Sequence, residues 1–235
     1  MRLREQKSLV PLQMKNALVV VSGTGTGIGK THFAEALLLA LGATGARAIG
    51  YKPIETGLAE ATVSDGARLD RASVFHVEPS AYLYGDPISP HLAARQQGEP
   101  IDVATIAERV FALRDQADVT VVELAGGLFS PLADETVNAD VVQALSPDRT
   151  LLVTPDRLGV LHEAIATIRA VATVPLRVDG IVVVEPELGD ASTGSNAEEL
   201  RRLQPVPVVA RLPRGTITDL SADPQVVALA AALLR

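Results

Sequence analysis

Residues 18–32 read LVVVSGTGTGIGKTH, and this stretch decides the fold. A continuous apolar run enters a glycine-rich turn, followed by Gly-Lys-Thr and then by apolar residues at helical spacing. This order predicts a strand, a loop and a helix. Backbone N–H groups in such a loop and at the start of the helix can surround phosphate oxygens. Lys30 can reach the outer phosphates of a nucleotide, and the Thr31 hydroxyl can bind Mg²⁺.

The loop is one residue longer than the standard phosphate-binding pattern. That pattern has a glycine five positions before Gly29, where this chain has Thr24. The preceding glycine is Gly23, so the spacing is G-x5-G-K-T. The dinucleotide pattern G-x-G-x-x-G matches in no register. The alternative interpretation is a glycine-rich turn followed by a chance Lys-Thr, and the order of strand, loop and helix favours the phosphate site.

Composition limits the class of protein. The 235 residues are 47% hydrophobic, which suffices for one domain with a full core, and 3% aromatic, so the core is mainly Ala, Val and Leu. A net charge of −7 argues against generic nucleic-acid binding. The chain has no cysteine, which excludes disulfides, Cys-based zinc sites and thiol nucleophiles and fits a cytoplasmic protein. No stretch has the length of a membrane span. We expect a flexible leader over residues 1–16 and one domain over residues 17–235.

Strands and helices alternate along the rest of the chain. Apolar runs predict strands over residues 46–51, 119–124, 150–154, 178–184 and 206–210, and helical spacing predicts helices over residues 103–115, 135–145, 196–203 and 225–234. Residues 58–100 contain four prolines and are expected to be irregular, apart from a short helix that begins at Asp65. This alternation predicts a single α/β domain of the P-loop NTPase type, with a mostly parallel, doubly wound sheet.

Polar residues follow two of the predicted strands. Lys52 and Thr56 come after the second strand, and ligands of open α/β sheets bind beyond the carboxyl ends of strands. Glu123 lies at the carboxyl end of the apolar run that begins at Val119, ahead of Gly126 and Gly127, which is where an acidic residue could hold Mg²⁺. Taken alone, Lys52 could be a solvated surface lysine and Glu123 an ordinary charge at a strand end. The glycines favour the metal role for Glu123.

Taken together, these motifs resemble those of the dethiobiotin synthetases, ATP-dependent carboxylases that close the ureido ring of the biotin precursor. The resemblance covers roughly residues 17–215. It rests on six motifs in order: Gly23-Thr24-x-Thr26-x-Ile28-Gly29-Lys30-Thr31, Gly50-Tyr51-Lys52-Pro53, Ser64-Asp65, Ser89-Pro90-His91, Val122-Glu123-x-Ala125-Gly126-Gly127 and Leu158-Gly159. The long G-x5-G-K-T loop is itself a feature of this family.

The resemblance implies a set of site residues. ATP binding is expected at Gly27, Ile28, Gly29, Lys30, Thr31, His32, Ala125 and Gly126, with Pro213, Arg214 and Gly215 along the adenine. The Mg²⁺ ligands would be Thr31, Asp65 and Glu123. Lys52 and Lys30 would act at the reacting centre, and Thr56 would contact the substrate. The family is dimeric, so Gly159, Val160, Leu161 and His162 would receive the substrate carboxylate from the partner subunit.

The implied reaction joins 7,8-diaminopelargonate and CO₂ into dethiobiotin with ATP and Mg²⁺, through a carbamate and a carbamic–phosphoric anhydride. The chain departs from the family at Gly25 and Gly27, where acids are common, at Leu124, where glycine is usual, and at Val184, where the family has an asparagine that reads adenine. Two alternatives stay open. One is a synthetase-like nucleotide-binding protein without this turnover, and the other is a partition- or cobyrinate-type P-loop ATPase.

Overall fold

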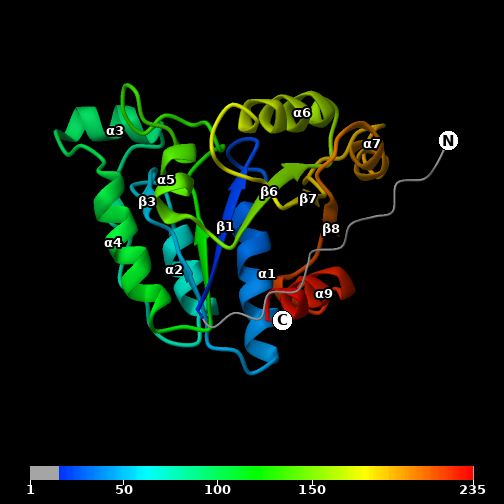
Figure 1. Cartoon of the computed structure of the whole chain (residues 1–235), viewed down its shortest axis with the longest axis horizontal. Coiled ribbons are helices and arrows are strands. Elements are labelled where there is room, and N and C mark those ends of the chain that lie inside the picture. The colour runs from blue at the N-terminus through cyan, green and yellow to red at the C-terminus, as the bar shows by residue number, and fades with distance from the viewer. Residues whose placement is uncertain (1–15, 235) are drawn as a thin grey trace.

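The computed structural model describes residues 16–234 and has a central sheet of six parallel strands (Figure 1). The expected leader over residues 1–16 lies outside the described residues except for Asn16. Along the sheet, the strands are ordered β2 (Ala48–Tyr51), β5 (Val119–Glu123), β1 (Ala17–Gly23), β6 (Arg149–Pro155), β7 (Gly180–Val184) and β8 (Val208–Leu212). The predicted parallel, doubly wound α/β sheet is confirmed.

Helices pack on both faces of this sheet. One face is covered by α1 (Lys30–Ala43), α2 (Asp65–Ala72), α8 (Ile217–Ser221) and α9 (Pro224–Leu233). The other face is covered by α4 (Val103–Arg114), α5 (Asn138–Leu145), α6 (Val160–Val171) and α7 (Asn196–Leu203), with α3 (Pro90–Gln97) packed beside α4 and α5. None of the helices in the described part has both the length and the apolar character of a membrane span.

The apolar run that opens the phosphate loop forms the central strand β1. Val19 and Val21 pack into the core beneath α1, whereas Leu18 and Val20 pack into the core beneath α4 and α5. All four side chains are fully buried. A strand buried on both faces needs an unbroken apolar sequence, which explains why this run does not alternate with polar residues.

The segment over residues 58–100 is more regular than the sequence predicts. Besides the expected α2, it contains α3 and the short strand β4 (Tyr82–Leu83), which pairs in parallel with β3 (Ile54–Glu55). The expectation that this segment is irregular is therefore wrong for these elements. They are too short to show a periodic pattern, and β3 and β4 exist through their contact with each other: the Tyr84 N–H donates to the Glu55 carbonyl at 2.9 Å.

The strand register brings separate parts of the chain to one edge of the sheet. Glu123, the last residue of β5, lies opposite Val21 of β1, and Val122 lies opposite Tyr51, the last residue of β2. Lys52, the next residue after Tyr51, is thereby level with Glu123. The ends of β1, β2 and β5 and the start of α1 thus meet at a single point.

Candidate active site

A cleft of about 830 Å³ opens at this edge of the sheet. The phosphate loop and the start of α1 form its floor. Its other borders come from the segment after β2, the start of α2, the segments after β5 and β7, and residues 213–215. This position beyond the carboxyl ends of parallel strands is the usual ligand site of an open α/β sheet.

The phosphate loop depends on glycine at two points. Gly27 has φ +68° and Gly29 has φ +91°, a region that L-residues with side chains seldom adopt. A Cβ atom on Gly29 would also lie 2.7 Å from Cγ1 of Val184. Gly29 caps α1, so its backbone conformation sets where the first N–H groups of that helix lie.

Lys30 is the first residue of α1 and folds back over the loop. Its Nζ donates to the Gly25 carbonyl at 2.7 Å, and 5% of the residue is exposed. Burial lowers the pKa of Lys30 to about 8, with a further contribution from the Lys52 ammonium, against the opposing effect of the Glu123 and Asp65 carboxylates. A triphosphate in the loop would bring negative charge to this partly desolvated ammonium group.

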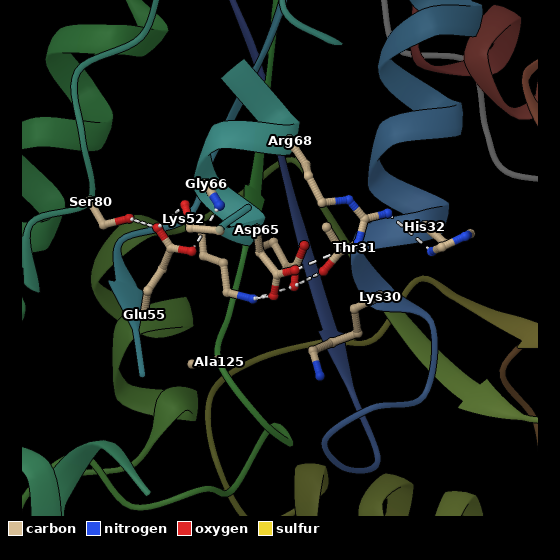
Figure 2. A network of polar contacts seen from close by, with 12 residues as sticks. Lys30, Thr31, His32, Lys52, Glu55, Asp65, Gly66, Arg68, Ser80 and Ala125 are labelled. Atoms are coloured by element: carbon tan, nitrogen blue, oxygen red, sulfur yellow. Dashed lines mark hydrogen bonds and ion pairs between the residues drawn. The ribbon is translucent and has the colours of Figure 1, made fainter. Parts of the chain in front are cut away.

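Lys52 joins the two carboxylates of the predicted metal site (Figure 2). Its Nζ donates to Oε1 of Glu123 at 2.8 Å and also to Oδ2 of Asp65. The Thr31 hydroxyl donates to the same Oε1 of Glu123 at 2.9 Å. Four residues from β5, α1, α2 and the segment after β2 therefore form one connected cluster.

Charge pairing sets the protonation of this cluster. Burial lowers the pKa of Lys52, but Glu123 and Asp65 together outweigh burial and hold it above its ordinary value. Burial alone would raise the pKa of Asp65, but Lys52 first and Arg68 next hold it below its ordinary value. Lys52 is therefore an ammonium and Asp65 a carboxylate at neutral pH.

The cluster has the donor set that a hard divalent cation requires. Glu123 is fully buried, and its Oε2 accepts no hydrogen bond from any described residue. A buried carboxylate oxygen without a partner is costly unless a cation or water contacts it. Between residues 16 and 234 there is no group of three or more His, Cys, Asp or Glu that could hold a metal ion. A cation here would therefore combine Glu123 and Asp65 with hydroxyl, phosphate or water oxygens.

The Arg68 guanidinium places a further positive charge beside Asp65. Its Nη1 lies 3.7 Å from Oδ1 of Asp65, while its Nη2 pairs with Glu35 and lies 3.1 Å from Nδ1 of His32. The sequence motifs single out neither Arg68 nor Glu55, which contacts the start of α2. Both border the cleft. An acidic residue directly after apolar Ile54 is the one sequence signal that points to Glu55.

The residues expected along the adenine also border the cleft. Pro213, Arg214 and Gly215 border it beside Val184, which pairs with Leu212 in the sheet, and the Arg214 guanidinium donates to the Glu187 carbonyl. The Val184 carbonyl already accepts the Asp156 N–H at 2.7 Å. The isopropyl side chain of Val184 cannot provide the hydrogen bonds of an asparagine amide.

The remaining predicted residues divide into two groups. Ala125, Gly126, Thr56 and His32 border the cleft. The segment of residues 159–162 does not border it in the described part of the chain. Gly159 caps α6 with φ +95°, Val160 is buried and His162 is exposed. Within one chain these residues therefore do not meet Lys52.

Comparisons with known proteins identify the family of this chain. An AAA-domain family model matches residues 17–221. The ATP-dependent dethiobiotin synthetase of Anaeromyxobacter dehalogenans (strain 2CP-1) is 38% identical over 199 residues, covering 82% of this chain and 88% of that protein. The enzyme of the same name from Aromatoleum aromaticum is 35% identical over 217 residues, covering 88% and 93%.

The fold is shared more widely than the sequence. A ParA family ATPase from Chlorobium tepidum superposes with a TM-score of 0.55 at 14% identity, covering 93% of this chain and 95% of that one. Similarity at that level shows the P-loop NTPase fold and nothing about the reaction. The relatives at 35–38% identity are dethiobiotin synthetases, and the resemblance inferred from the motifs is confirmed. The chain belongs to the dethiobiotin synthetase family.

Proposed function

We propose that this chain is an ATP-dependent ligase that makes dethiobiotin from 7,8-diaminopelargonate and CO₂, with Mg²⁺. The observation that carries the proposal is the convergence of Lys30, Thr31, Lys52, Asp65 and Glu123 at one edge of the sheet, beside the phosphate loop. This arrangement combines a triphosphate site with a buried ammonium group that faces the same cleft.

The proposed reaction has three steps. One substrate amine attacks CO₂ and loses a proton, which gives a carbamate. A carbamate oxygen attacks the γ-phosphorus of ATP, ADP leaves, and a carbamic–phosphoric anhydride results. The second amine then attacks the carbonyl carbon, phosphate leaves, and the amine loses a proton as the ring closes. Because negative charge moves between oxygen atoms at every step, positioning and neutralisation by the protein matter more than acid–base catalysis.

The residues of the cluster divide these tasks. The loop N–H groups and Lys30 would hold the phosphates, since Lys30 already lies over the loop. Lys52 would stabilise the carbamate and the transferring phosphoryl group, because its pKa is held high and it remains charged. Thr31, Asp65 and Glu123 would hold Mg²⁺, which neutralises phosphate charge when it is bound. Thr56 borders the cleft close to Lys52 in the sequence and would contact the diamine.

The start of α6 completes the proposed site in a homodimer. Gly159 caps this helix, and the Val160 N–H already donates to the Arg157 carbonyl at 3.1 Å. The N–H groups of Gly159, Leu161 and His162 would then form an anion site suited to the substrate carboxylate. These residues do not border the cleft of their own chain, so they would serve the partner subunit. Mixing a Lys52→Ala chain with a Gly159→Asp chain tests this, because only a mixed dimer has one site with both groups intact. Recovery of activity on mixing is expected, and no recovery contradicts the shared site.

Release of phosphate tests the proposal and separates the alternatives. The protein is assayed with ATP, Mg²⁺, bicarbonate and 7,8-diaminopelargonate, and each component is omitted in turn. We expect release to require all four and dethiobiotin to appear in equal amount. Release that does not need the diamine favours a partition-type ATPase. Nucleotide binding with no release under any condition favours a synthetase-like binding protein.

A further inference from the structure

Glu55 is a buried acid that has no ion-pair partner in the described part of the chain. It ends β3, and 5% of it is exposed. No basic side chain among residues 16–234 lies within 4.0 Å of its carboxylate. Its oxygens instead accept the Gly66 N–H at 2.9 Å, the Ser80 hydroxyl at 2.8 Å and the Ser64 hydroxyl at 3.4 Å. Burying a carboxylate costs free energy, and here three neutral donors offset that cost. This arrangement indicates a structural role for Glu55.

The donors lie on both sides of Asp65. Ser64 precedes it and caps α2 by accepting the Ala67 N–H at 3.1 Å, and Gly66 follows it. Figure 2 shows the Glu55 carboxylate between Ser80 and Gly66, next to the point where Lys52 meets Asp65. With both neighbours fixed, the backbone of Asp65 has little freedom, and its side chain is directed at Lys52.

The fit between Glu55 and the first turn of α2 is close. A Cβ atom on Gly66 would lie 2.5 Å from Oε1 of Glu55 and 3.2 Å from the Ser80 hydroxyl oxygen. Even one methyl group at this position would push the carboxylate and the helix apart. The contact of Glu55 with this turn therefore requires a glycine directly after Asp65.

We propose that Glu55 is a positioning residue that fixes the first turn of α2 and thereby places the Asp65 carboxylate against Lys52. The inference rests on the proposed function only for what Asp65 and Lys52 then do. Glu55 acts by accepting hydrogen bonds and does not itself touch the reacting atoms. Its negative charge is therefore dispensable, whereas its acceptor geometry is not.

Two substitutions of Glu55 separate these properties. In Glu55→Gln, the amide oxygen can accept from Gly66 while the NH₂ group donates to the Ser80 hydroxyl oxygen, so kcat should stay within about threefold of wild type. In Glu55→Ala, kcat should fall about 10- to 100-fold, as when the supporting partner of a site carboxylate is lost. The KM for ATP should change less than about threefold, because the phosphate loop is untouched.

Ser73→Ala is the matched control at the other end of the same helix. Ser73 accepts the Gly50 N–H at 2.8 Å and donates to the Leu69 carbonyl at 2.7 Å, far along α2 from Asp65. This variant should lower the urea midpoint while kcat stays near wild type. If Ser73→Ala and Glu55→Ala reduce kcat equally, Glu55 merely stabilises the helix and the inference is overturned. Equal kcat losses in Glu55→Gln and Glu55→Ala also overturn it, because its charge would then act directly.

Two further measurements keep the test decisive. If Glu55→Ala does not fold, Gly66→Ala replaces it as the test variant and should show the same loss of kcat. A wild-type kcat in Gly66→Ala contradicts the inference. A double-mutant cycle of Glu55→Ala and Asp65→Ala, read from urea midpoints, needs no activity at all. We expect Asp65→Ala to shift the midpoint less when Glu55 is already absent, and additive shifts overturn the inference. If the wild-type protein releases no phosphate that depends on the diamine, the proposed function is refuted, but the inference about Glu55 is not. The cycle of urea midpoints then tests whether Glu55 positions Asp65.

Discussion

Replacing Lys52 by alanine should separate turnover from nucleotide affinity. The ammonium of Lys52 forms ion pairs with both Glu123 and Asp65. Preorganised donors aimed at developing negative charge are each worth about 10²- to 10³-fold in kcat. We expect Lys52→Ala to lose that much turnover. The Kd for Mg²⁺–ATP should rise less than about threefold, since the loop N–H groups and Lys30 remain.

The same substitution should cost stability. Glu123 is fully buried, and without Lys52 its one described hydrogen-bond donor is the Thr31 hydroxyl. Breaking one side of a buried ion pair costs about 3–5 kcal/mol. For a domain of this size that corresponds to a drop in Tm of roughly 6–20 °C. Removing both charges in Lys52→Met/Glu123→Gln should recover most of this stability and none of the turnover.

The assay pairs phosphate release with binding of a fluorescent ATP analogue, and circular dichroism verifies that each variant is folded. Lys30→Ala is the matched control. Because Lys30 lies over the phosphate loop, this variant should lose nucleotide affinity, while its kcat at saturating ATP changes less. Equal losses of kcat and affinity in Lys52→Ala would refute the placement of Lys52 at the reacting centre. Identical patterns for the two lysines would refute their division of tasks.

Three other predictions follow from the loop and the adenine end. Gly29→Ala should abolish nucleotide binding and destabilise the fold by about 1–3 kcal/mol, because Gly29 has φ +91° and the new Cβ would lie 2.7 Å from Val184. Gly42→Ala, in the exposed last turn of α1, should instead stabilise the fold by about 0.5–1 kcal/mol, and equal urea midpoints for the two variants would contradict the geometry. Since the pKa of Lys30 is lowered to about 8, affinity for the ATP analogue should fall above pH 8, by up to about tenfold per unit, while Lys30→Met gives a flat profile. The free energy of unfolding changes in the opposite direction. In the unfolded chain Lys30 has its ordinary pKa of 10.5 and keeps its proton up to that pH, so its contribution to stability rises between pH 8 and 10.5. Because Val184 offers no amide to the base, kcat/KM for CTP and GTP should lie within about 100-fold of that for ATP, and a stricter preference for ATP rules this out.

Much of the fold could be predicted from local sequence. The unbroken apolar run of β1 and the glycine-rich loop after it determine a strand, a turn and α1 in that order. The helix predicted over residues 196–203 has those bounds in the structure, since its polar and apolar residues alternate with helical period. The short pair β3 and β4 could not be predicted, because two residues show no period and their hydrogen bonds come from a distant segment.

In the candidate site, too, the residue types follow from local sequence, whereas their arrangement depends on distant segments. The sequence by itself predicted which residues would carry the chemistry, because Lys30, Thr31, Lys52, Asp65 and Glu123 each lie in one of the six motifs. It also determined the family, because six weak motifs in a fixed order are specific together. Local patterns set the chemical type of a residue and the element on which it lies.

Only the tertiary structure decided how these residues meet. The insertion of β5 between β1 and β2 places Lys52 level with Glu123, and this strand order leaves no trace in local periodicity. The contact of Glu55 with the first turn of α2 likewise joins residues that are 11 positions apart and share no motif. Packing of distant segments, and the requirement that each buried polar group find a partner, set the geometry of this site.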